Sequence, residues 1–208
     1  MMIIMYNVNG NLKGMTMRVS RNQVLQNKCM ILEAAGRLFR ERGFESVTVT
    51  DVMKSAGLTH GGFYGYFKSK DDLIAQALGK VLGSAGALPA DLASCAEQYL
   101  SPGHRDNFAG GCPVAALASE TIRQSGGARA EMTADLKRQI ERLGRIAPGP
   151  DQAHKRRAAI GNWSAMVGAL ILARMSDDVD LSDEILNETR DWLAAQDEET
   201  SRPSHDVT

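Results

Sequence analysis

The chain has 208 residues, of which 43% are hydrophobic and 24% charged, and its formal net charge is −1. This composition is typical of a globular protein with a sizeable core, and it excludes collagen-like, disulfide-stapled and strongly charged disordered chains. The charge is unevenly spread, because ten basic and six acidic side chains between Arg18 and Lys80 give that segment a net +4. A basic N-terminal segment on an acidic body indicates a polyanionic partner at one end of the molecule.

Three cysteines, Cys29, Cys95 and Cys112, lie far apart, with no Cys-x-x-Cys pair and no His/Cys cluster. This spacing predicts neither a disulfide framework nor a structural zinc site, and it suits the reducing cytoplasm. The opening MMIIMY is apolar but too short for a signal peptide or a membrane span, so we expect no membrane association. Residues 1–21 are expected to be a disordered arm, part of which would be lost if translation began at a later methionine.

Sequence signatures of catalysis are missing: the chain has no Gly-x-Ser-x-Gly elbow, no phosphate-binding loop and no His-Glu-x-x-His. Asp151 and His154 have the spacing of one half of a di-metal carboxylate site, but the chain carries no second copy of that motif. We therefore expect no enzymatic activity, no cofactor and no metal.

The first helix is predicted over residues 22–42, where apolar residues recur at three- and four-residue steps. Gly43 is a natural C-cap for it. Thr48, followed three residues later by Asp51, has the pattern of an N-cap with a capping-box acid. The helix that begins there is predicted to be short and to end at Gly57.

Two more caps follow closely. Thr59 is predicted to cap a helix over 60–67, and Ser69, with Asp72 three residues later, is predicted to cap a fourth helix. Two short helices joined by a glycine-containing turn and flanked by longer helices are typical of a helix-turn-helix, whose second helix enters the major groove of DNA. The sequence therefore predicts a DNA-binding module.

The second short helix has an unusual composition, since the stretch HGGFYGYF holds three glycines and four aromatic residues. His60, Gly61 and Gly62 would form its first turn, where glycine removes bulk and lets backbone N–H groups approach DNA. Phe63 and Phe67, one turn apart, are expected to hold the helix on the core.

Tyr64 and Tyr66 are expected to point outward, with their hydroxyls available to phosphates. Lys70, in the first turn of the following helix, would add a positive charge beside them. These three residues are therefore predicted to contact the DNA backbone.

The segment ILEAAGRLFRERGFESVTVTDVMKSAGLTHGGFYGYFKSKDDL resembles the DNA-binding domain of the TetR family of bacterial transcription regulators, over about residues 22–82. The resemblance rests on the FYGYF run, the Ser-Lys-x-x-Leu start of the fourth helix and the Gly-Phe turn after the first helix. The third helix is richer in glycine than in many relatives, which leaves few side chains to read bases. The resemblance implies DNA contacts at Thr48, Thr50, Thr59, His60, Gly61, Gly62, Tyr64 and Lys70.

Beyond residue 85 the pattern stays helical but is looser, and proline and glycine interrupt it. Helices are predicted over 89–100, 113–124, 128–146, 151–175 and 182–196, with a loop over 101–111. The resemblance implies an all-α architecture in which a helix-turn-helix domain, 22–84, precedes a helical bundle for ligand binding and dimerisation, 85–197. Residues 198–208 are expected to be a flexible tail.

A stripe of small residues, Gly161, Ala165, Gly168 and Ala169, lies along the predicted helix over 151–175. Such a stripe lets another helix pack closely, and the pattern suits an internal core helix as well as an interface between two copies. In the TetR family the last two long helices pair with their copies in the dimer. A homodimer would also place two recognition helices one duplex turn apart on a palindromic operator.

The resemblance further implies a repressor that a small apolar or amphipathic inducer releases from DNA. The alternative is a repressor without a small-molecule ligand, and a closed apolar cavity of roughly a few hundred Å³ would separate the two. The candidate pocket-lining residues are Tyr99, Phe108, Cys112, Leu117, Trp163, Met166 and Leu170.

Cys112 supports one more alternative, a thiol-based sensor of oxidants or electrophiles. It lies at or next to the N-cap of a helix that begins with Pro113, where the helix dipole and the positive charge of Arg105 would favour a thiolate. The competing interpretation is a small buried hydrophobic residue.

Overall fold

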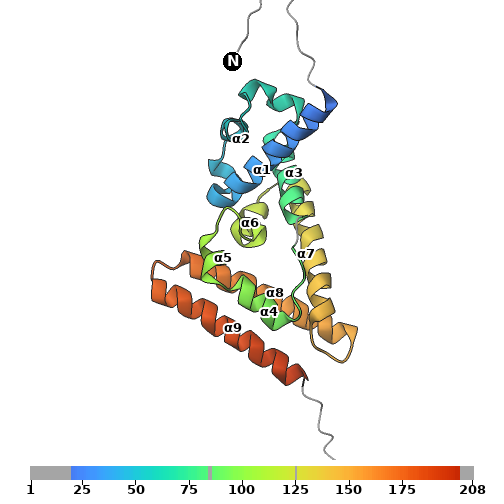
Figure 1. Cartoon of the computed structure of the whole chain (residues 1–208), viewed down its shortest axis with the longest axis vertical. Helices are drawn as coiled ribbons and strands as arrows, with labels where there is room; N and C mark the ends of the chain where they lie inside the picture. Colours follow the sequence, from blue (N-terminus) through green and yellow to red (C-terminus); the bar gives the residue numbers. More distant parts are fainter. Residues whose placement is uncertain (1–19, 84–85, 125, 202–208) are drawn as a thin grey trace, which may run out of the picture.

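A computed structural model of the chain describes residues 20–83, 86–124 and 126–201, and the regular elements within those ranges are all helical. They lie in an elongated molecule with the first elements at one end (Figure 1). The all-α fold predicted from the sequence is confirmed. In chain order the elements are α1 (Arg21–Ser46), α2 (Val49–Ser55), the 3₁₀ helix η1 (His60–Gly65), α3 (Lys70–Leu82), α4 (Leu92–Tyr99), α5 (Pro102–Asp106), α6 (Pro113–Thr121), α7 (Gly126–Ile146), α8 (Gln152–Met175) and α9 (Val179–Ser201).

Helix α1 is longer than predicted because it resumes after a kink. Its N-cap is Ser20, whose side chain accepts a hydrogen bond from the Gln23 N–H at 3.2 Å. Gly43, with φ 79°, interrupts the helix where a C-cap was predicted, and a last helical segment continues to Ser46. The predicted N-terminal arm therefore ends before residue 21, and residues 1–19 lie outside the described ranges.

The two short elements after α1 begin where they were predicted. Thr48 caps α2 with the full capping box: its Oγ1 accepts from the Asp51 N–H at 3.1 Å, and its own N–H donates to Asp51 Oδ2 at 2.9 Å. The next element, however, is a 3₁₀ helix that ends at Gly65, and Thr59 makes no side-chain cap to it. Three of its six residues are glycine, a poor α-helix former, and short 3₁₀ turns suit such sequences.

Helix α3 connects the first elements to the rest of the chain. Ser69 caps it as predicted, accepting a hydrogen bond from the Asp72 N–H at 3.1 Å. Helix α3 packs on α1 and along α7, α7 packs on α8, and α8 packs on α9. Helices α3 and α7 lie along one side of the molecule, and α8 crosses its lower part next to α9 (Figure 1).

Two boundaries in the second half differ from the predictions. The loop predicted over 101–111 contains α5, which begins with Pro102 after Ser101 as its N-cap. Helix α9 continues to Ser201, past the predicted start of the tail, because glutamate and alanine in its last turns favour the helix. The remainder of the predicted tail, 202–208, lies outside the described ranges.

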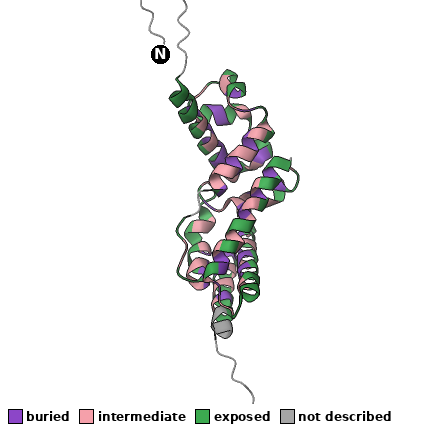
Figure 2. Cartoon of the chain, turned by 90° about the vertical axis from the view of Figure 1, so that its right-hand side faces the viewer, coloured by how far each residue is buried: buried purple, intermediate pink, exposed green. Residues whose placement is uncertain are grey.

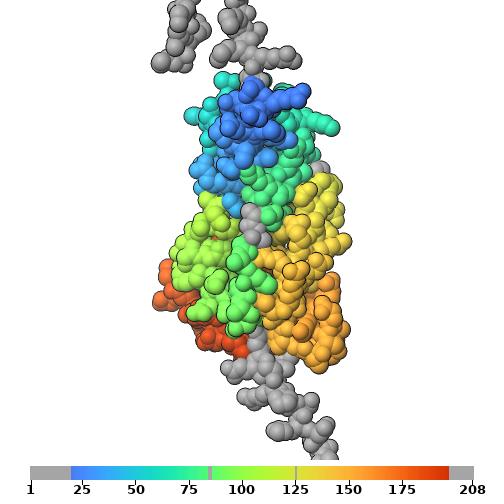
Figure 3. Space-filling model, turned by 45° about the vertical axis from the view of Figure 1, so that its right-hand side comes forward, coloured from blue at the N-terminus to red at the C-terminus, as the bar shows by residue number. Residues whose placement is uncertain are grey.

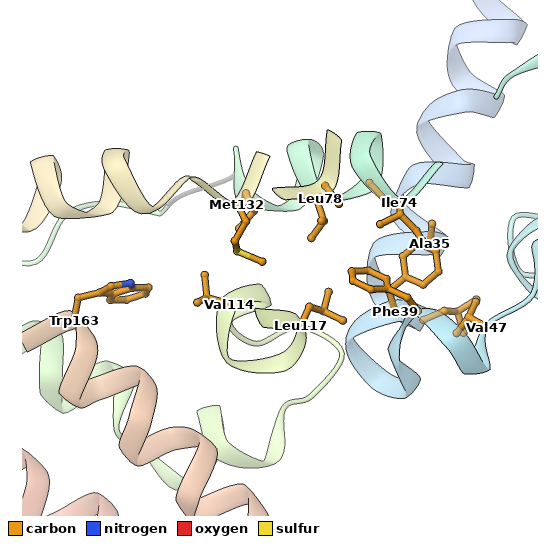
Figure 4. Packing of buried hydrophobic residues seen from close by; sticks show 14 of the residues in the cluster. Ala35, Phe39, Val47, Ile74, Leu78, Val114, Leu117, Met132 and Trp163 are labelled. Atoms are coloured by element: carbon orange, nitrogen blue, oxygen red, sulfur yellow. The ribbon is translucent and has the colours of Figure 1, made fainter. Parts of the chain in front are cut away.

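One continuous apolar cluster runs through the molecule and joins its two ends. Buried residues follow the inner faces of the helices along its length (Figure 2). Phe63 and Phe67 are buried as predicted, with ring centroids 5.6 Å apart. Leu117 of α6 lies next to Phe39 of α1 (Figure 4), so α6 shares a core with the first helix.

Helix α8 is, by length and composition alone, long and apolar enough to cross a membrane, and it is the single such helix among the described residues. Its apolar residues Ala159, Met166 and Leu170 are buried in the protein, and α7 and α9 pack on either side of it. This packing is that of the central helix of a bundle.

Candidate functional site

The exposed face of α2 and η1 carries the residues predicted to contact DNA. Thr48, Thr50, Thr59 and His60 are all exposed. Thr50 Oγ1 lies 3.2 Å from His60 Nδ1, so the two elements are joined by this contact at the surface. The structure therefore brings the threonines and the histidine together on one face.

Gly61 lies on this face, and packing within the protein does not require a glycine there. A Cβ built on Gly61 would meet nothing within 4 Å, and one on Gly62 would meet only ordinary contacts, the nearest at 3.8 Å. The fold would thus tolerate larger side chains at both positions. Close approach of an external surface is the remaining structural reason for small residues there.

The two tyrosines of the stretch differ from each other. Tyr64 is 75% exposed, as predicted. The prediction that Tyr66 points outward is wrong: it is half-buried, and its hydroxyl accepts a hydrogen bond from Asn27 Nδ2 of α1 at 2.9 Å. Tyr66 follows the short 3₁₀ helix and lies three residues after Phe63, so it faces the core side. Lys70 is partly exposed at the start of α3.

The carboxylates of two aspartates at this end of the molecule accept hydrogen bonds at helix N-termini. Asp51 accepts hydrogen bonds from the Thr48 side chain and backbone, which hold the pKa of its carboxyl below the ordinary value. Asp72 accepts from the Lys68 N–H at 2.9 Å, which lowers the pKa of its carboxyl in the same way. The charges of these carboxylates are offset by N–H groups, which leaves the nearby lysines to dominate the surface potential.

A second candidate site is a cavity of about 390 Å³ between the first helices and the bundle. Arg40 of α1 and Val81 and Leu82 of α3 form its wall on one side. On the other sides it is lined by residues of α4 to α8 and of the segments before α4 and α6: Ala87, Leu88, Pro89, Cys95, Gln98, Tyr99, His104, Gly110, Gly111, Cys112, Pro113, Val114, Asp135, Gln139, Arg142, Leu143 and Trp163.

Three of the predicted pocket residues line this cavity, namely Tyr99, Cys112 and Trp163. The rings of Tyr99 and Trp163 meet edge to face, with centroids 5.4 Å apart. The other four predicted residues do not line it. Leu117, Met166 and Leu170 are buried in the apolar core, and Phe108 is 46% exposed, with the Arg174 guanidinium 4.7 Å from its ring.

Several polar cavity residues were missed in the sequence, chiefly Arg40 and Arg142. Unlike the exposed Arg37 and Arg42 of α1, Arg40 is half-buried, and its Nη1 donates to the Gly111 carbonyl at 3.4 Å. A usable signal is Gly36, one turn earlier on the same face, where a Cβ would collide with Val81 of α3. That glycine marks the side of α1 that faces another helix.

His104 joins three segments beside the cavity. Its Nδ1 lies 2.7 Å from the Tyr99 carbonyl oxygen, and its Nε2 accepts a hydrogen bond from the Cys112 N–H at 3.0 Å. Burial lowers the pKa of His104. The neutral imidazole with its proton on Nδ1 satisfies both contacts.

The thiolate predicted at Cys112 is not favoured. Cys112 is the N-cap of α6, as expected, but burial raises the pKa of its thiol. Arg105 does not supply a charge to it, because that guanidinium pairs with Asp106 and Asp183. Cys112 therefore fits the alternative interpretation, a small buried residue in a cavity wall.

The exposed Thr/His face on two short helical elements, held by longer helices with an aromatic core, defines a helix-turn-helix DNA-binding protein. A model of bacterial regulatory proteins of the tetR family matches residues 31–77. An uncharacterized HTH-type transcriptional regulator of Mycobacterium tuberculosis is 29% identical over 194 residues, which cover 83% of this chain and 96% of that protein. AcrR of Shigella flexneri is 34% identical over 59 residues, 28% of this chain and 27% of AcrR.

Solved structures share the whole fold. Reduced E. coli NemR superposes with a TM-score of 0.68 at 18% identity, over 81% of this chain and 96% of NemR. AibR, in complex with isovaleryl coenzyme A and operator DNA, superposes with a TM-score of 0.54 at 17% identity, over 80% of this chain and 97% of AibR. The chain belongs to the TetR family of transcription regulators, which are DNA-binding proteins and not enzymes.

Proposed function

We propose that this regulator is a cytoplasmic repressor that binds a palindromic operator as a homodimer and leaves the operator when a small molecule occupies the cavity. The observation that carries the proposal is the position of the cavity. Its wall includes Arg40 of α1 and Val81 and Leu82 of α3, so one space is bounded by both proposed domains, 22–84 and 85–197. A molecule bound there contacts the helices that support the DNA-facing elements.

Helix α6 supplies a mechanical link between the cavity and the DNA-facing end. Its first residues, Pro113 and Val114, line the cavity. Near its other end, Glu120 accepts a hydrogen bond from the Phe44 N–H at 2.6 Å, just after the kink in α1. A ligand that binds better when α6 is displaced would change the placement of α1, and by linkage would weaken DNA binding.

The outer face of α8 and α9 supports the homodimer. Leu172 and Trp192 are 50% and 55% exposed, and they border a groove that also contains Ala165 and Gly168. A Cβ on Gly168 would meet nothing within 4 Å, so the small residue is not required by packing within one chain. A second copy of this face would bury these apolar residues and use the small stripe for close helix packing.

The DNA contacts are proposed at Thr48, Thr50, Thr59, His60, Gly61, Gly62, Tyr64 and Lys70, while Tyr66, whose hydroxyl is bonded to Asn27, is left out. Lys70 would bind phosphate, and His60, held by Thr50, would read a base edge. The fold of AibR, solved with an acyl coenzyme A and operator DNA, offers a precedent for both ligands on one such fold.

The site is not the closed apolar cavity that was expected, because it is partly open and Arg40, Asp135 and Arg142 lie in its wall. Its volume of about 390 Å³ is nevertheless in the size range of small-molecule sites, which supports a ligand over the ligand-free alternative. The thiol-sensor alternative is also weaker, because burial raises the pKa of Cys112 instead of lowering it.

Selection of bound sequences from a random duplex pool, followed by a search for compounds that abolish binding, tests the proposal. Lys70→Ala should weaken binding about equally on all selected sequences, whereas His60→Ala should change the preference at one base pair by ~1–3 kcal/mol. Recovery of no palindrome, or similar behaviour of the two variants, would contradict the proposed contacts.

A further inference from the structure

The cavity contains buried hydrogen-bond donors that the protein itself does not satisfy. Trp163 Nε1 and Arg40 Nε have no hydrogen-bond partner among the described residues, the Tyr99 hydroxyl has none besides the Cys112 thiol, and all three side chains line the cavity. Trp163 is only 8% exposed. Buried polar groups are rarely left unpaired, because an unmade hydrogen bond is costly away from water. The protein therefore supplies no oxygen acceptor to these particular donors.

The cavity also carries positive charge that is not matched. Within the described ranges, neither Arg40 nor Arg142 forms an ion pair, and burial lowers the pKa of Arg40. The contact from Arg40 to the Gly111 carbonyl is long, at 3.4 Å. The acid in the cavity wall, Asp135, is paired with Arg138 at 3.1 Å and also acts electrostatically on Arg142, so among the described residues Arg40 is the arginine of the wall that has no carboxylate near it. A half-buried guanidinium without a counter-charge favours an anionic ligand.

Part of the wall is apolar. Val114 and Leu143 line it beside the Trp163 ring. Trp163 points from α8 toward Val114 of α6 and Met132 of α7 (Figure 4). This side of the cavity suits a hydrocarbon or aromatic body of limited size.

We propose that the ligand is a small organic carboxylate with an apolar body. Its carboxylate accepts hydrogen bonds from Arg40 and Tyr99, its body packs against Val114 and Leu143, and an oxygen on the body accepts from Trp163. The inference rests on the proposed function, in which this molecule is the inducer, and it names the chemical class of that inducer.

Because Arg40 lies on α1, the charge of a bound carboxylate would act directly on the proposed DNA-binding domain. Arg40 lies on α1, three residues before the kink at Gly43. A carboxylate would compete with the Gly111 carbonyl for this guanidinium, because a charge-assisted hydrogen bond is stronger than one to a neutral carbonyl. Binding would then loosen the connection between α1 and the segment that leads into α6.

The test is calorimetric titration of the full chain, without DNA, with 3-(4-hydroxyphenyl)propanoate and octanoate and with the primary amide of each acid. The acids should bind at least ~10-fold more tightly than their amides, as expected for a hydrogen bond to a charged partner. Arg40→Gln should remove this preference and leave amide binding unchanged. Arg145→Gln, an exposed arginine of α7 outside the cavity, should change neither affinity.

A second measurement needs no ligand. Arg40→Met should raise the melting temperature of the ligand-free protein, because it removes a half-buried charge that has no counter-ion. A lower melting temperature would show that Arg40 is already satisfied within the protein and would overturn the proposal.

In the titration, three results would also overturn the proposal: amides that bind as tightly as acids, an acid preference that survives Arg40→Gln, or no binding of either acid at millimolar concentration. These assays contain no DNA, so such results leave the repressor function standing; acids that bind but release no operator would count against that function instead.

Discussion

At the scale of single residues, His104 determines how the cavity wall is held together. It contacts the carbonyl that ends α4 and the backbone N–H that precedes α6. Protonation would turn Nε2 from an acceptor into a donor and would set it against the Cys112 N–H. The folded protein therefore favours neutral His104, in agreement with its lowered pKa.

This histidine should make stability depend on pH in a defined direction. Because the folded state lowers the pKa of His104, the unfolded chain binds the proton more readily, and the stabilising effect is fully present above the ordinary value of 6.5. This stabilisation should be lost as the pH falls below 6.5 and through the pKa of His104 in the folded protein. Urea unfolding between pH 7.5 and 5 would show a smaller decline in His104→Gln than in the wild type. Parallel declines in the two proteins would contradict this role.

Gly43 and Gly57 form a matched pair for testing backbone strain. Both have positive φ, 79° and 71°, but a Cβ on Gly43 would collide with the Glu120 carboxylate, while one on Gly57 would meet nothing within 4 Å. Gly57→Ala should cost about 1 kcal/mol from conformation alone. Gly43→Ala should cost roughly 2–3 kcal/mol, because Glu120 must also leave the Phe44 N–H. Equal losses in chemical denaturation would show that the contact with Glu120 contributes nothing.

At the scale of elements, local signals predicted most boundaries and long-range packing explains the errors. The caps at Thr48 and Ser69 could be read because each depends on a residue three positions away. The same kind of signal, Ser101 before Pro102, was present for α5 and was overlooked. By contrast, the burial of Arg40 depends on helices distant in sequence, which periodicity within α1 does not reveal.

The pocket residues illustrate the same limit. Apolar size identified Trp163 and Tyr99, but it equally selected Met166 and Leu170, because bulky residues along one face of α8 can meet either the cavity or the packed core. These α8 residues follow one another at three- and four-residue steps, so which of them lines the cavity depends on where along its length α8 meets the other helices. Tyr66 was misplaced for a similar reason, since a 3₁₀ helix and an α-helix orient the same sequence differently.

The pairing of α8 and α9 with a second copy can be tested with one substitution. Leu172→Glu places a charge in the exposed groove beside Trp192, and it should convert the dimer to monomer in sedimentation velocity and weaken operator binding at least ~10-fold. Ile122→Glu is the control, because Ile122 is 73% exposed next to α6 and lies outside the α8–α9 groove. Dissociation in both variants, or in neither, would place the interface elsewhere.

At the scale of the whole molecule, the proposed DNA-binding face and the proposed dimer face lie at opposite ends, with the cavity between them. The space-filling view shows α1 to α3 at one end of the long axis and α8 and α9 toward the other (Figure 3). This arrangement lets two chains join at one end while their recognition elements remain separate at the other. Small changes around the cavity would then alter the spacing between the recognition elements.

The most direct test of the account compares the operator affinity of the intact palindrome with that of a duplex in which one half-site is scrambled. A dimer that reads both halves should bind the intact site at least ~100-fold more tightly, with two protomers per duplex. Its affinity should also fall steeply with salt, because phosphate contacts release counterions. Equal affinity for the two duplexes, with one protomer bound to each, would contradict the account.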